Sequence, residues 1–147
     1  MRVSSQGLPV ARRWAHKLYL VVASLILIGI VIEGVLIGPS LFTATRWGQA
    51  VHGDLGGVLL LLTLLLPVAG RLARLRGRVI LVSAVLFVLA LLEVTSAALG
   101  RRISLLAALH PANALLMGAL TVFLLMHGWQ LMRESGSEMK TQGGPHS

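Results

Sequence analysis

Residues 79–99 read VILVSAVLFVLALLEVTSAAL, and this stretch decides the fold. It contains a single ionisable residue, Glu93, and it is as long as the run of about 20 apolar residues that a helix needs to cross a bilayer. Similar runs lie at about 17–38, 50–69 and 105–131. We therefore predict an all-α integral membrane protein with four membrane-spanning helices.

The composition of the chain agrees with a membrane protein. Of its 147 residues, 56% are hydrophobic and 12% are charged, and the mean hydropathy is +0.84. Soluble domains have about 25% charged residues. The chain has no cysteine, which excludes disulfides, iron–sulfur clusters, thiolate zinc sites and covalently attached c-type haem. The net charge of +8 reflects arginines at membrane edges, so nucleic acid is not an expected partner.

The short connections between the runs predict an up-down bundle, because they favour antiparallel neighbours. Most basic residues lie on one side of the predicted membrane: Arg2, Arg12, Arg13, Lys17, Arg71, Arg74, Arg76, Arg78, Arg133 and Lys140. The other side has Arg46, Arg101 and Arg102. The positive-inside rule then places both termini in the cytoplasm. We expect the bundle to lie in a bacterial cytoplasmic (inner) membrane.

This topology divides the chain into three parts. Residues 1–16 form a cytoplasmic N-terminal segment, 17–131 the transmembrane bundle, and 132–147 a polar cytoplasmic tail, in which we expect no regular structure from Glu134 onward.

Proline and short polar residues predict where helices begin and end. Gly38 and Pro39 should end the first span, and Pro111 should lie in the first turn of the fourth helix. Asp54 and Asn113 are expected to cap helix starts.

One pattern occurs twice in the chain. Glu33 lies near the end of the first run and His52 opens the second, while Glu93 lies near the end of the third run and His110 opens the fourth. Ionisable side chains inside a bilayer are costly and usually functional. The spacing that aligns the two histidines also aligns other positions: Leu62 with Leu120, Thr63 with Thr121, and Leu66 with Leu124. Two matched pairs near the outer face predict one site shared by two halves.

The histidines are candidate axial ligands of haem. His52 and His110 begin helices that run parallel in an up-down bundle, so they lie at the same depth, and diagonal helices would make them face each other. Two opposed neutral imidazoles suit ligation of haem iron. Gly56, Ala114 and Gly118 share faces with them and would leave room for a macrocycle, or would let helices pack closely.

The acids have three interpretations. Glu33 and Glu93 would accept the second ring N–H of the histidines, carry protons or bind a quinol, or lie at the headgroup level without a chemical role. His16 and His127, near the cytoplasmic face, are candidates for a second ligand pair or for interfacial anchors.

The segment LHPANALLMGAL at 109–120 resembles a family of small, uncharacterised four-helix bacterial membrane proteins. These have a histidine opening the second span and a Leu-His-Pro-x-Asn motif opening the fourth, which His52, His110, Pro111 and Asn113 match. The resemblance covers the whole bundle and implies its architecture, without an established activity.

The architecture is also similar to one half of haem A synthase. That family has two four-helix halves, each with histidines at the outer ends of its second and fourth helices, and His52 and His110 match those positions. Glu33 is separated from His52 by a loop, and Gly53 stands where the family has arginine. The resemblance implies a bis-histidine haem site rather than haem A synthesis.

We therefore expect a membrane protein that binds b-type haem near the outer face through His52 and His110. Its role would be one-electron transfer, with quinol or a redox protein, or that of a haem-bearing subunit in a larger membrane complex or homo-oligomer. Two alternatives remain open: a cofactor-free structural subunit, and a metal or proton-handling site in which Glu33 and Glu93 join the histidines. No phosphate loop or nucleophile–base motif indicates a particular enzyme.

Overall fold

The computed structural model of the chain describes residues 10–42, 47–100 and 102–142, and every regular element in these ranges is a helix. The helices are α1 (Val10–Phe42), α2 (Trp47–Leu72), α3 (Gly77–Leu99) and α4 (Ser104–Gln142). All four contain a segment that is long and apolar enough to cross a membrane. The predicted all-α, four-span membrane bundle is confirmed.

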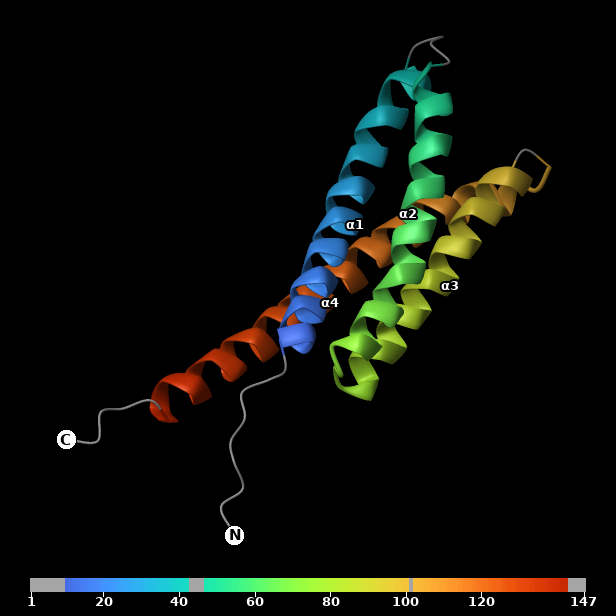
Figure 1. Cartoon of the computed structure of the whole chain (residues 1–147). Coiled ribbons are helices and arrows are strands. Elements are labelled where there is room, and N and C mark those ends of the chain that lie inside the picture. The colour runs from blue at the N-terminus through green and yellow to red at the C-terminus, as the bar shows by residue number, and fades with distance from the viewer. Residues whose placement is uncertain (1–9, 43–46, 101, 143–147) are drawn as a thin grey trace.

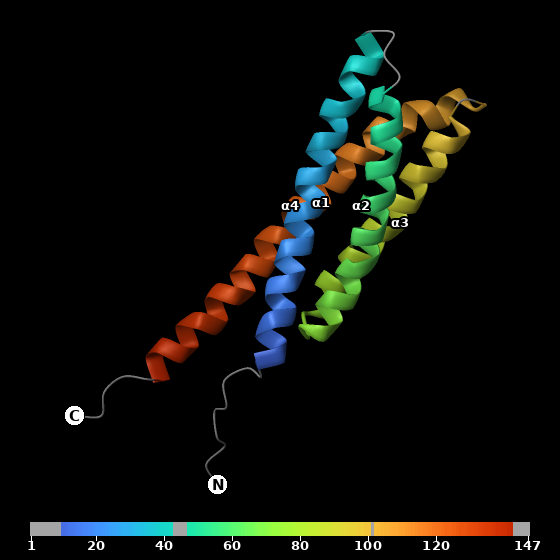
Figure 2. The same cartoon turned by 45° about the horizontal axis from the view of Figure 1, so that its top comes forward.

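The helices alternate in direction. The α1–α2 and α3–α4 connections lie at one end of the bundle, and the α2–α3 turn lies at the other, together with the start of α1 (Figure 1). The turned view shows the same up-down arrangement (Figure 2). We call these the loop end and the terminal end.

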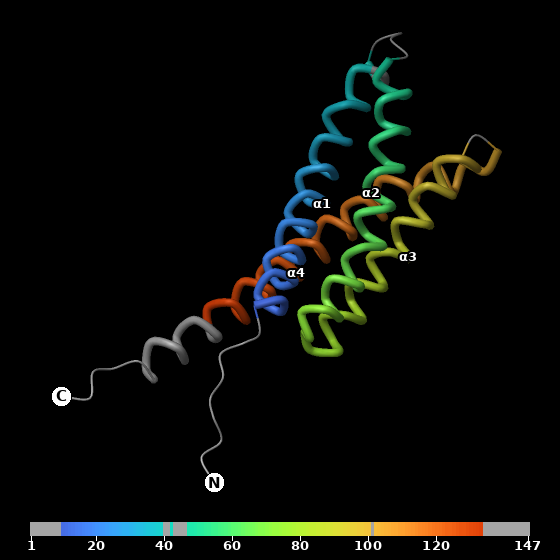
Figure 3. The backbone as a smooth tube through the Cα atoms, viewed as in Figure 1, coloured from blue at the N-terminus to red at the C-terminus, as the bar shows by residue number. Residues whose placement is uncertain are grey.

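The order of packing places α2 and α4 on a diagonal. Each helix packs against the next one along the chain, and α1 also packs against α4. Within the described ranges, no Cα of α2 lies within 8 Å of a Cα of α4, nor one of α1 within 8 Å of one of α3, so these helices meet only through side chains. Figure 3 traces the two hairpins, α1–α2 and α3–α4, that this ring of contacts joins. The diagonal relation that a shared histidine site requires is therefore present.

Large apolar side chains cover the outside of the bundle. Val35 is 70% exposed and Leu115 is 77% exposed, and each helix has several such residues. A contiguous apolar surface of this extent is incompatible with a monomeric soluble protein but suits contact with lipid. A few polar side chains are instead buried inside the bundle, among them Thr63, Ser83, Ser96 and Thr121.

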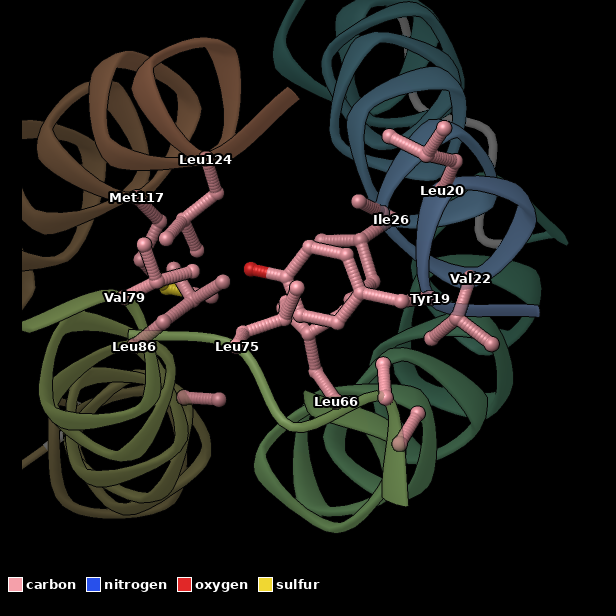
Figure 4. Packing of buried hydrophobic residues seen from close by; sticks show 14 residues of the cluster. Tyr19, Leu20, Val22, Ile26, Leu66, Leu75, Val79, Leu86, Met117 and Leu124 are labelled. Carbon is pink, nitrogen blue, oxygen red and sulfur yellow. The ribbon is translucent and has the colours of Figure 1, made fainter. Parts of the chain in front are cut away.

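The buried hydrophobic core includes Tyr19, near the terminal end. Its ring lies among leucine and isoleucine side chains, including Ile26 of α1 itself, Leu66 of α2 and Leu124 of α4 (Figure 4). The Tyr19 hydroxyl lies 3.1 Å from the Ser83 Oγ. This hydrogen bond joins α1 to α3, the other diagonal pair of helices. It gives the Tyr19 hydroxyl a partner, which lipid chains cannot provide.

The two hairpins repeat each other in burial. The aligned residues Thr63 and Thr121 are both fully buried, and each donates its hydroxyl hydrogen to a carbonyl of the preceding turn. Leu66 and Leu124 are also both fully buried. The weak sequence repeat thus corresponds to equivalent positions in the two hairpins.

Three expected helix boundaries were wrong. Pro39 lies inside α1, which continues to Phe42, and Pro111 lies in the second turn of α4 rather than the first. Asp54 and Asn113 lie inside helices and cap neither. Neighbouring helices replace the backbone bonds that proline removes, so membrane helices tolerate interior proline.

The tail also differs from expectation, because α4 continues as a helix through the polar segment to Gln142. Extending an existing helix avoids the cost of nucleation. The next proline, Pro145, lies beyond the end of the helix.

Gly100 offers a test of the α3–α4 connection. A Cβ at this position would lie 2.8 Å from the Ser96 carbonyl oxygen and 3.3 Å from the Ala107 Cα, both backbone atoms. We expect Gly100→Ala to lower the unfolding free energy by about 1–3 kcal/mol, as overpacking does. Thermal unfolding in detergent measures it.

Gly77→Ala is the matched control, because a Cβ there has no neighbour within 4 Å. Equal stability of the two variants would show that the α3–α4 turn is not packed as described.

Candidate functional site

The first half of the site joins α1 to α2. The His52 Nδ1 contacts the Glu33 carboxylate through Oε2. The Glu33 side chain is 12% exposed and that of His52 is 25% exposed. No other side-chain partner of the Glu33 carboxylate occurs among the described residues. The acid that ends one span and the histidine that opens the next therefore form a pair.

The second half joins α3 to α4 and has more bonds. The His110 Nδ1 lies 3.2 Å from the Glu93 Oε1. It also lies 3.2 Å from both the Ser96 Oγ and the Glu93 carbonyl oxygen. Asn113 donates through Nδ2 to the Glu93 Oε2, at 2.5 Å, and to the Leu89 carbonyl, at 2.9 Å. Glu93 is thus held by two residues of α4.

The two histidine rings meet across the α2–α4 diagonal. The ring centroids of His52 and His110 are 6.0 Å apart, and their planes are inclined by 75°. Two imidazoles that bind one ion from opposite sides, with metal–nitrogen distances of about 2.0–2.1 Å, have centroids about 6 Å apart. Because each Nδ1 faces a carboxylate of its own hairpin, the Nε2 atoms are the ones available for a shared ligand.

The described residues contain no group of three or more His, Asp or Glu side chains placed to hold a bare metal ion. Each carboxylate contacts the Nδ1 of the histidine in its own hairpin. The site therefore offers two nitrogen donors and suits an ion that brings its other ligands with it. A haem iron, with four equatorial nitrogens of its own, has that property.

The small residues predicted near the histidines lie against α1. A Cβ on Gly56 would be 3.6 Å from the Glu33 Oε1, and a Cβ on Gly118 would be 4.0 Å from Ile30. Ala114 is half-buried. The Glu33 carboxylate thus occupies space beside Gly56, and the contribution of the three small residues to a cofactor pocket stays a prediction.

Sequence reasoning missed Ser96 and Asn113. Asn113 was assigned to a helix cap, although its spacing from His110, three residues on, already places both on one helix face. In the first hairpin the equivalent positions are Leu36 and Leu55. The site is therefore asymmetric: one pair has amide and hydroxyl support, and the other does not.

The remaining two histidines lie near the terminal end. The His127 Nδ1 is 3.0 Å from the Phe123 carbonyl, and its ring centroid is 4.0 Å from that of Phe123. His16 is buried beside the carbonyl of Gly128. No ring contact joins His16 to His127 in the part of the chain that the structure describes. The structure does not assemble them as it assembles His52 and His110.

Comparison with protein-family models, with curated proteins and with solved structures gives no match. The function must therefore be argued from the site itself.

Asn113 tests whether the polar network holds the site together. We expect Asn113→Leu, which copies the first hairpin, to lower the unfolding free energy by about 1–3 kcal/mol because Glu93 loses a buried donor. Thermal unfolding in detergent measures the change. Leu115→Ala, on the exposed face of the same helix, is the control. A variant as stable as the wild type would show that Glu93 does not depend on this bond.

Proposed function

We propose that this protein binds one b-type haem at the loop end of the bundle, with His52 and His110 as axial ligands. The observation that carries the proposal is the pair of imidazoles 6.0 Å apart, contributed by helices on opposite corners of the bundle. Bound haem would supply a one-electron redox centre.

The protein's own residues prepare the ligands. Glu33 and Glu93 each approach the Nδ1 of a histidine, which favours the tautomer with the proton on Nδ1 and leaves Nε2 as the donor. Asn113 holds the Glu93 carboxylate, and so orients His110 indirectly.

The location of the site follows from the distribution of charge. Arg12, Arg13 and Lys17 begin α1, and Arg71 to Arg78 surround the α2–α3 turn, so the terminal end is strongly basic. We infer that this end faces the cytoplasm of a bacterium and that the loop end, with the candidate haem site, faces outward from the inner membrane. We infer that a redox protein, a larger membrane complex or a homo-oligomer is the setting for this electron-transfer role.

A visible spectrum tests haem binding. The full-length protein, expressed with sufficient haem and purified in detergent, should show sharp α and Soret bands in a dithionite-reduced minus oxidised spectrum. His52→Ala and His110→Ala should each abolish the bis-histidine bands, because a single axial ligand remains. His127→Ala, on the same helix as His110 but at the other end, should leave them unchanged.

A colourless wild-type protein would overturn the proposal. One observation favours a second function in that case, because each histidine already has a carboxylate partner and the pairs can act as polar connections within a structural subunit. The histidine variants would then lower thermal stability without any spectral change.

The acids provide a separate test of the ligand geometry. We expect Glu33→Gln and Glu93→Gln to retain the haem spectrum but to weaken haem retention by about 10–100-fold, the effect typical of groups that orient metal ligands. Haem transfer to apomyoglobin measures the loss. Asp54→Asn removes an exposed acid of α2 and is the matched control. Loss rates equal to that of the wild type would remove the acids from the site.

A further inference from the structure

A groove lies between α3 and α4 at the loop end, next to the second half of the site. Its volume is about 380 Å³, within the range of about 300–1,000 Å³ that is typical of small-molecule pockets. Leucines of both helices form its walls, and Thr95, Ser96 and Asn113 add polar atoms.

The groove opens on the outside of the bundle. Two of its leucines, Leu92 and Leu109, are 55% and 50% exposed. In a membrane this surface contacts lipid, so a ligand of the groove enters from the bilayer and has to be largely apolar.

The polar residues of the groove connect it to the histidine site. The Ser96 Oγ lies 3.2 Å from the His110 Nδ1. The hydrogen bonds of Asn113 among the described residues all use its amide nitrogen. Its amide oxygen, which can accept two hydrogen bonds, is therefore available to a ligand hydroxyl.

The first hairpin indicates that these polar residues serve more than packing. Its equivalent positions are leucines, Leu36 and Leu55, and they complete the same helical arrangement. A groove that only accommodated lipid chains would need no hydroxyl or amide, because lipid chains offer nothing for them to bind. The second hairpin thus has hydrogen-bonding side chains at two positions where the first has leucines.

We propose that this groove binds the ring of a membrane quinol. The flat ring and tail suit leucine walls, and a ring hydroxyl suits the Asn113 amide oxygen as acceptor. The ligand would then lie one residue, Ser96, away from His110. The proposal deepens the proposed function, on which any redox role of the groove rests, but binding of the ring itself requires no haem.

Photolabelling tests the groove directly. The full-length protein in detergent is irradiated with a photoreactive azidoquinol, and the labelled peptides are mapped by mass spectrometry. We expect label on residues 92–116 that excess decylubiquinol displaces and dodecane does not. Ala112→Trp fills the groove and should lower the label about tenfold, because the pocket is lost.

Leu115→Trp places the same side chain on the neighbouring exposed position, outside the groove, and should leave the label unchanged. Displacement by dodecane as effective as that by decylubiquinol would show a groove for any apolar chain and would overturn the proposal, as would label that is insensitive to Ala112→Trp. Competed label on a protein without haem would support this site while contradicting the haem proposal. A protein that shows the haem spectrum but takes up no label would support the haem proposal and contradict the quinol proposal.

Discussion

The contacts between acids and histidines at the loop end depend on a property of the bilayer: lipid offers no hydrogen bonds. A glutamate or histidine carried into an apolar span has to find its partner on another helix. Glu33 contacts His52 on α2, and Glu93 contacts His110 on α4, so each hairpin brings its own acid and histidine together. Both contacts use the Nδ1 atom of the imidazole.

The core at the terminal end of the bundle fixes the arrangement of the helices that carry the two histidines. Tyr19 of α1 bonds to Ser83 of α3, and buried side chains from all four helices surround its ring. With α1 packed against α4, the ring of helices closes and α2 and α4 take opposite corners. The core at the terminal end and the site at the loop end are thus separate parts of one bundle, since the first sets the helix arrangement that the second requires.

The two acid–histidine pairs of the site differ in the side chains that surround them. The Glu93–His110 pair is supported by Ser96 and Asn113, whereas Glu33 has only His52 among the described side chains. The polar groups that support the second half also line the groove between α3 and α4. Ser96 and Asn113 therefore belong both to the lipid-facing groove and to the histidine site. The proposed haem site and the proposed quinol site are adjacent, but each can be tested without the other.

The amino-acid sequence by itself determined the class of fold. Runs of apolar residues such as 79–99 have only one stable form in lipid, because a helix satisfies its own backbone bonds. The repeated acid and histidine could also be found from sequence, since an ionisable residue within an apolar run stands out.

The role of Asn113 could not be found from sequence, because its partners Glu93 and Leu89 lie on another helix and only packing brings them together. Pro39 and Pro111 were misplaced for a related reason, as rules for isolated helices omit neighbours that stabilise an interior proline. Only the tertiary structure decided that α2 and α4 face each other, that the imidazoles meet at 6.0 Å, and that the two halves are supported differently. Such properties depend on distances between helices, which side-chain packing sets and which periodicity along one helix does not contain.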